Sequence, residues 1–135
     1  MSDEGGVVNK KFLVMGVLKD KSFSLALEIV QVYKFLVEEK REFVMSKQLL
    51  RSGTSVGAMV RESQNAESKN DFIHKLAIAQ KECDESLYWL ELIHDSGFLN
   101  EEMFNSCYQH SQEILKILKS VIISTKQNLN KLKDP

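Results

Sequence analysis

Carboxylates and histidines are the groups in this 135-residue chain that could do chemistry. Four acidic residues lie in one predicted helix: Glu82, Asp84, Glu85 and Glu91. A pair of carboxylates is the minimum for general acid and base catalysis. The spacing nevertheless places these acids on the solvent side of the helix, with no predictable pocket, which is typical of a solvated or ion-paired face. An enzyme would need Glu62, Glu82 or Glu85 to meet a histidine at a subunit junction, and this is the least favoured hypothesis.

The three histidines, His74, His94 and His110, raise the question of a metal site. At about 100° per residue, His74 and His94 project roughly 160° apart from the same predicted helix, so they cannot share an ion within one chain. No HExxH occurs, and a ferritin-like site would need Glu-x-x-His on two helices, whereas the sequence has it once, at Glu91–His94. The sequence therefore predicts surface or interface histidines and no metal ligands.

The segment LLRSGTSVGAMVRE, residues 49–62, contains serines and glycines that could suggest a nucleophile or a phosphate loop. No GxSxG elbow is present, and the glycines lack the following Gly-Lys-Ser/Thr of a phosphate loop. Gly53 and Gly57 instead stand four apart, on one face of a predicted helix, where a neighbouring helix can approach closely. We therefore predict helix packing at these glycines, no catalytic residue, no cofactor and no enzymatic activity.

The elements that position these residues follow from composition and periodicity. Hydrophobic residues make up 43% and charged residues 27% of the chain, and the one proline is Pro135, which favours long helices. Apolar periodicity predicts four helices, over residues 22–40, 46–66, 68–95 and 100–128. The expected organisation is a flexible or strap-like segment 1–17, a bundle 18–130 and a frayed tail 131–135. Within the first segment, residues 12–18 are expected to lie on the bundle as an extended strap.

Local signals mark the helix ends. Ser68 is expected to cap the third helix with Asp71 reaching back, Gly97 to end that helix, and Asn100 to cap the fourth. An antiparallel hairpin turning near Gly97 separates Cys83 and Cys107 by roughly 9 Å along the helices, so both are predicted to be reduced and buried.

Two of the predicted helices are apolar on more than one side. Such faces need cover beyond the core of one chain, which predicts a homo-oligomer. The residues expected at the oligomer interface are Leu25, Ile29, Leu36, Ile78, Trp89, Leu92 and Ile93.

Charge and hydropathy restrict the partners. The formal net charge is −1, so no global positive field attracts nucleic acid. Lys47, Arg51 and Arg61 are the candidate nucleic-acid contacts, although acids beside this basic cluster favour a solvated surface. The acidic start and the lack of an apolar run of about 18 residues predict a cytoplasmic protein without a membrane partner.

The string SKQLLRSGTSVGAMVRESQNAESKNDFIHKLAIAQKECDESLYWLELIHDSGFL, residues 46–99, resembles a bacterial family. This family is the four-helix-bundle proteins encoded in intervening sequences of 23S rRNA genes, also called the S23 ribosomal protein family. The shared features are the RSGTS-V-GA segment, Glu62, the entry Ser68-Lys69-Asp71-Phe72 and the cluster Tyr88-Trp89-Leu90, and the similarity extends over residues 18–124.

The resemblance implies an antiparallel up-down four-helix bundle that assembles into a ring, typically a homopentamer, with no enzymatic activity. It also implies a relation in fold to the accessory variability determinant protein of diversity-generating retroelements, a basic pentamer that binds nucleic acid and a reverse transcriptase. The sequence thus predicts an all-α homo-oligomeric scaffold or interaction protein of unknown specific role. The alternative is an RNA- or DNA-binding accessory protein associated with ribosomal RNA or a reverse transcriptase, and a protein partner is also open.

Overall fold

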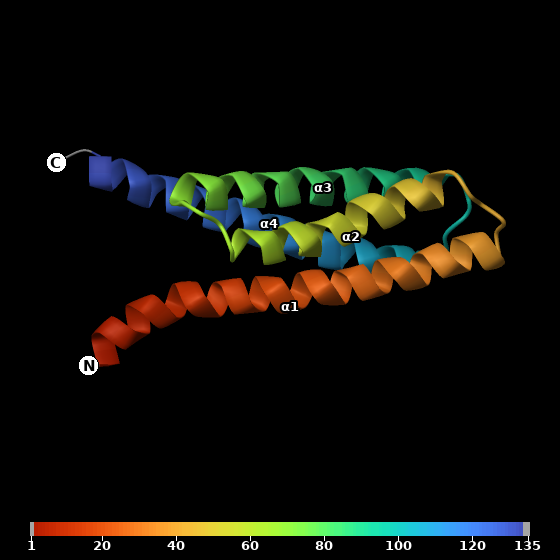
Figure 1. Ribbon diagram of the computed structural model, residues 1–135. Coiled ribbons are helices and arrows are strands. Elements are labelled where there is room, and N and C mark those ends of the chain that lie inside the picture. Colours follow the sequence, from red (N-terminus) through yellow and green to blue (C-terminus); the bar gives the residue numbers. More distant parts are fainter. Residues whose placement is uncertain (1, 134–135) are drawn as a thin grey trace.

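The computed structural model describes residues 2–133, with side chains for residues 10–132. It contains four helices: α1 Ser2–Glu38, α2 Met45–Ser63, α3 Lys69–Asp95 and α4 Glu101–Lys133. Successive helices run antiparallel, and α1 and α3 each pack against both α2 and α4 (Figure 1). No strand occurs within residues 2–133. The predicted all-α, up-down four-helix bundle is confirmed.

The core is aliphatic and takes side chains from every helix. Its largest fully buried members are Leu18, Leu25, Ile29, Val32, Leu36, Leu49, Val56, Leu76, Leu90, Ile93, Ile114 and Leu118. Fully burying one such side chain contributes about 1.5–3 kcal/mol, so this core is the main source of stability.

The start of α1 differs from the prediction. Residues 12–18 continue the helix from Ser2, so the expected extended strap is wrong. Ser22 had suggested a helix start, but it is buried within α1 and its hydroxyl donates to the carbonyl of Lys19 at 3.1 Å. A serine that bonds back to the preceding turn does not cap a helix. Met1 and residues 134–135 lie outside the described part of the chain.

Two other helix ends also differ from their predicted positions. α2 ends at Ser63, three residues before the predicted end, and α4 continues to Lys133, through part of the expected frayed tail. These are shifts of helix boundaries within the same arrangement of four helices.

The predicted caps at both ends of α3 and at the start of α4 are confirmed. Ser68 Oγ accepts from the Asp71 amide at 3.0 Å, and Asp71 in turn accepts from the Glu67 amide at 3.2 Å. Gly97 adopts φ +87°, the left-handed conformation that ends α3. The amide of Met103 donates to Asn100 Oδ1 at 2.8 Å, which caps α4.

The α1–α2 turn contains a cap that sequence reasoning missed. Glu42 is buried, and its carboxylate accepts from the amides of Val44 and Met45 at 3.0 Å and from Ser46 at 2.7 Å. Burial alone would raise the pKa of Glu42, but these backbone donors outweigh it and hold the pKa below its usual value. The first amides of α2 are therefore satisfied by a carboxylate that precedes the helix.

Candidate functional site

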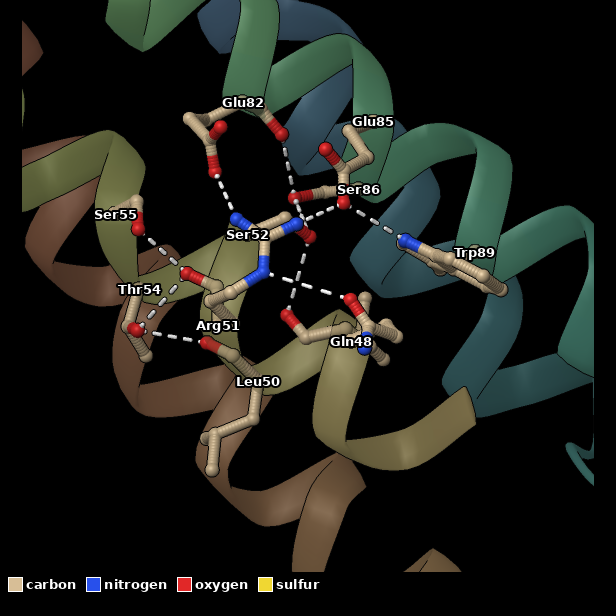
Figure 2. Close-up of polar contacts among 11 residues, drawn as sticks. Gln48, Leu50, Arg51, Ser52, Thr54, Ser55, Glu82, Glu85, Ser86 and Trp89 are labelled. Carbon is tan, nitrogen blue, oxygen red and sulfur yellow. Dashed lines mark hydrogen bonds and ion pairs between the residues drawn. The ribbon is translucent and has the colours of Figure 1, made fainter. Parts of the chain in front are cut away.

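A polar cluster joins α2 to α3 at the RSGTS segment, and we call it the Arg51 cluster (Figure 2). The Arg51 guanidinium donates to Glu82 Oε2 at 3.0 Å and also pairs with the carboxylate of Glu85. The indole N–H of Trp89 donates to the same Glu85 oxygen at 3.0 Å. One arginine thus bridges two acids one turn apart on α3, and the single tryptophan orients one of them.

Two buried serines continue the cluster into the helix interface. Ser86 Oγ lies 3.0 Å from Ser52 Oγ and 2.9 Å from the backbone oxygen of Glu82. Each hydroxyl has one proton, so a consistent network has Ser86 donating to the Glu82 carbonyl and accepting from Ser52. This hydrogen bond ties α2 to α3 at a point that water does not reach.

The Arg51 cluster offers little catalytic chemistry. Glu82 and Glu85 both pair with the Arg51 guanidinium, which occupies one oxygen of each carboxylate. Glu62 lies apart from them and pairs with Lys75 at 3.7 Å. The structure brings none of these three acids into an ion pair with a histidine among residues 10–132. The residues required by the enzymatic hypothesis are therefore not assembled within this chain.

Two of the three histidines are held by separate carboxylates, whereas His74 is exposed and makes no ion pair with residues 10–132. His94 lies 2.5 Å from Glu101 Oε1 and 3.1 Å from Asp95 Oδ1, and its ring stacks on Phe104 with centroids 4.0 Å apart. Hydrogen bonds to Glu101 and then Asp95 raise the pKa of His94. His110 pairs with Glu28 of α1 at 2.7 Å. Within the described residues, no group of three or more His, Cys, Asp or Glu side chains could hold a metal ion.

Gly53 and Gly57 both face α1. A Cβ on Gly53 would lie 2.7–2.9 Å from three side-chain carbons of Ile29, and a Cβ on Gly57 would lie 3.1 Å from the carbonyl oxygen of Ser22. Real Cβ atoms almost never approach as closely as the first of these distances. This geometry supports the proposed packing role of both glycines, because each leaves room for a part of α1.

Four of the seven expected interface residues lie in the core. Leu25, Ile29, Leu36 and Ile93 are fully or almost fully buried in the single chain, so they offer no surface to a second copy. Ile78 and Trp89 are half-buried, and Leu92 is exposed. The expectation for the three residues of α1 was wrong because α1 has two apolar stripes, and periodicity alone does not show which stripe faces the core.

The second stripe of α1 is the one exposed to water. Its large apolar side chains are 44–74% exposed, and we call this surface the α1 apolar face: Phe12, Leu13, Val17, Phe23 and Leu27.

The three candidate nucleic-acid residues do not act as one group. Arg51 is paired twice with α3, whereas Lys47 and Arg61 are exposed near opposite ends of α2. The charge of Arg51 is therefore largely neutralised by its own chain.

Both cysteines are free and buried. The Cys83 thiol donates to the carbonyl of Ser111 at 3.2 Å. Burial raises the pKa of Cys83 to about 12 and also raises the pKa of Cys107. Buried thiols of this kind behave as small apolar residues.

The fold and the glycine-packed α1–α2 seam define a small, all-α bundle protein whose described helices contain no stretch able to cross a membrane. The sequence model of the family described as 23S rRNA-intervening sequence protein matches residues 17–120, and the chain belongs to that family. Among solved structures, the chain is similar to a protein with unknown function from the S23 ribosomal protein family of Bacteroides thetaiotaomicron VPI-5482. The two share 52% identity and a TM-score of 0.79, over 81% of this chain and 97% of the other. A search of curated proteins found no match.

The specific role of this family is not established by these relatives, which agrees with the expectation of an unknown specific role.

Proposed function

We propose that the protein is a homo-oligomeric helical scaffold or interaction protein with no catalytic activity of its own, the pentameric ring implied by the family resemblance being its expected form. The observation that carries this proposal is the α1 apolar face. Five large apolar side chains exposed along one helix are more than an isolated bundle needs, and such patches mark protein–protein contacts.

The side chains of the α1 apolar face line up along the helix axis. Phe12 and Phe23 are eleven residues apart and point in nearly the same direction, and Leu27 follows Phe23 by one turn. Fully burying side chains of this size contributes about 1.5–3 kcal/mol each, so covering the exposed part of all five contributes on the order of 5 kcal/mol. A second copy of the chain supplies apolar cover of the same kind.

Gly16 gives independent support, because it lies among these residues. A Cβ on Gly16 would meet nothing within 4 Å, whereas Gly53 and Gly57 each have a neighbour that fills the space. A glycine inside a helix costs about 1 kcal/mol relative to alanine. Packing within the chain therefore does not account for Gly16, and close approach of another subunit does.

Sedimentation velocity at micromolar concentration tests the proposal with two matched variants. Leu27→Glu places a charge in the α1 apolar face, and Ile123→Glu places the same charge on α4, the two positions being 55% and 56% exposed. We expect an oligomer for the parent protein and for Ile123→Glu, and dissociation for Leu27→Glu. A monomeric parent protein, or an unchanged Leu27→Glu oligomer, would contradict the proposal.

The cytoplasmic location, the relation in fold to the accessory variability determinant protein and an association with ribosomal RNA or a reverse transcriptase stay predictions. The residues first expected to contact nucleic acid give that role little support, because Arg51 is engaged with Glu82 and Glu85.

A further inference from the structure

Charge is divided along the axis of the bundle. In α3 the lysines come first, at Lys69, Lys75 and Lys81, and most of the acids follow, at Glu82, Asp84, Glu85, Glu91 and Asp95. In α4 the order is reversed: the acids are Glu101, Glu102 and Glu113, and the lysines are Lys116, Lys119, Lys126, Lys131 and Lys133. Because the helices are antiparallel, both sets of lysines lie at the end that also holds the N-terminal part of α1 (Figure 1). We call it the basic end.

Helix stability does not explain this division. Acids at the start and lysines at the end of α4 suit the helix dipole, but α3 carries the opposite order, with Asp71 as the exception in its first turn. Placing the lysines of both helices at one end of the bundle also adds repulsion between them. A pattern that opposes local stability in this way is expected where a partner supplies the compensating charge.

Several carboxylates of the acidic end are paired within the chain. Glu82 and Glu85 pair with Arg51, and Glu113 pairs with Lys21. At the basic end, the one ion pair among residues 10–132 joins Lys75 to Glu62. The lysines there that have no carboxylate of residues 10–132 within 4 Å are Lys10, Lys11, Lys69, Lys81, Lys116, Lys119, Lys126 and Lys131. A second copy could therefore offer the basic end only part of its acids, whereas every phosphate of a polyanion from another molecule is available.

The basic end contains a groove between α1 and α4 that is lined by hydrogen-bond donors. Its polar lining consists of Lys10, Lys11, Ser120, Ser124, Thr125 and Asn128, above an apolar floor that includes Met15 and Val121. The hydroxyl of Thr125 is buried and donates to the Val121 carbonyl at 2.7 Å. The lysine ammonium, serine hydroxyl and asparagine amide groups can donate to phosphate oxygens, and among residues 10–132 no carboxylate or aromatic side chain lines the groove. From Ser120 to Asn128 the groove follows α4 for about 12 Å, the length of three to four phosphates of one strand at a rise of about 3.4 Å each.

We propose that the basic end binds the phosphate backbone of a nucleic acid, with the α1–α4 groove as the principal contact. The binding is independent of base sequence, because phosphates carry no sequence information and the groove has no aromatic ring on which a base could stack. This site lies away from the Arg51 cluster, and it does not depend on the α1 apolar face.

Fluorescence anisotropy with a labelled single-stranded RNA of mixed sequence tests this proposal across a series of salt concentrations. The test variant is Lys10→Gln/Lys11→Gln, and the matched control is Lys34→Gln/Lys47→Gln, which removes the same charge from exposed lysines outside the basic end. For the parent protein we expect affinity that falls steeply with salt. Loss of two phosphate contacts lowers the slope of log K against log salt by about 1.4 for a single strand, and the control should keep the parent slope.

Three results would overturn the proposal. The first is that the parent protein does not bind RNA at low salt. The second is that both double variants weaken RNA binding equally. The third is that Lys10→Gln/Lys11→Gln weakens self-association and leaves RNA binding unchanged. The second result would mean that only net charge matters, and the third would assign the basic end to a second copy. Circular dichroism confirms that each variant keeps its helices.

Discussion

Replacing Gly53 with alanine tests the α1–α2 seam directly. Alanine in a helix interior gains about 1 kcal/mol over glycine from propensity alone. Against this gain, the new Cβ would lie 2.7 Å from Cγ1 and 2.9 Å from both Cγ2 and Cδ1 of Ile29, well inside the 3.4–4 Å of ordinary contact. Ile29 is fully buried and cannot turn outward, so overpacking of about 1–3 kcal/mol follows. We therefore expect a net loss of up to about 2 kcal/mol, in place of the gain of about 1 kcal/mol that an unhindered alanine would give.

Gly57 and Ala58 supply internal references on the same helix. Gly57→Ala meets the Ser22 carbonyl at 3.1 Å, a tighter contact than usual but a single one, so we expect little net change in stability. Ala58→Gly at an exposed position measures the propensity term by itself, at a cost of about 1 kcal/mol. The informative quantity is the change in the free energy of unfolding caused by Gly53→Ala, corrected for the propensity term that Ala58→Gly measures.

Urea unfolding followed by circular dichroism, at one protein concentration for all variants, gives the free energies. The double variant Gly53→Ala/Ile29→Ala completes the cycle, because truncating Ile29 removes all three clashing carbons. The double variant should be more stable than the sum of the single effects predicts, by about 1–2 kcal/mol. If Gly53→Ala were more stable than the parent protein by about the full propensity gain of 1 kcal/mol, or if the two changes were additive, the seam would not be closely packed.

Three further predictions concern titratable groups. Glu42→Gln should lower the free energy of unfolding at pH 7 by about 0.5–2 kcal/mol, through loss of a charged cap. Since the pKa of Glu42 is lowered in the fold, this contribution is complete above the usual value of 4.5 and is lost as pH falls through the lower folded pKa. The deficit should therefore shrink in strong acid, and a deficit that is unchanged there would contradict the assignment. NMR should show His94 titrating above 6.5, with Glu101→Gln moving the midpoint down, because hydrogen bonds to Glu101 and Asp95 raise its pKa. Protonated His94 thus adds stability that is complete below pH 6.5 and is lost as the pH rises through the folded pKa. A titration midpoint of His94 that does not respond to Glu101→Gln would exclude this carboxylate as the cause. Cys83 and Cys107 should react with a thiol reagent at mildly alkaline pH only after unfolding, since burial raises both pKa values, and rapid labelling of the native protein would show that the thiols are accessible.

The helix ends that depend on local chemistry were predictable from sequence. Ser68, Gly97 and Asn100 act through backbone groups within a few residues, and the structure shows each in the expected role. The beginning of α1 was not predictable in this way, because Ser22 has the same side chain whether it caps a helix or bonds back within one. Glu42 was missed for a related reason: a carboxylate that caps a helix from outside resembles any other charged residue in a turn.

Which side chains are exposed could not be predicted without the positions of the neighbouring helices. Leu25 and Leu27 are equally apolar, and only the position of α1 in the bundle makes the first buried and the second exposed. Arg51 likewise looked like a free cation until α3 placed Glu82 and Glu85 beside it.

The sequence alone determined the class of fold, because helical periodicity, the lack of an internal proline and local capping residues act over distances of one or two turns. It also marked the α1–α2 seam, since glycines four apart necessarily share a helical face. Tertiary structure decided what is available to a partner. Burial and ion pairing depend on residues distant in the chain, and the antiparallel arrangement alone brings the lysines of α1, α3 and α4 to one end of the bundle.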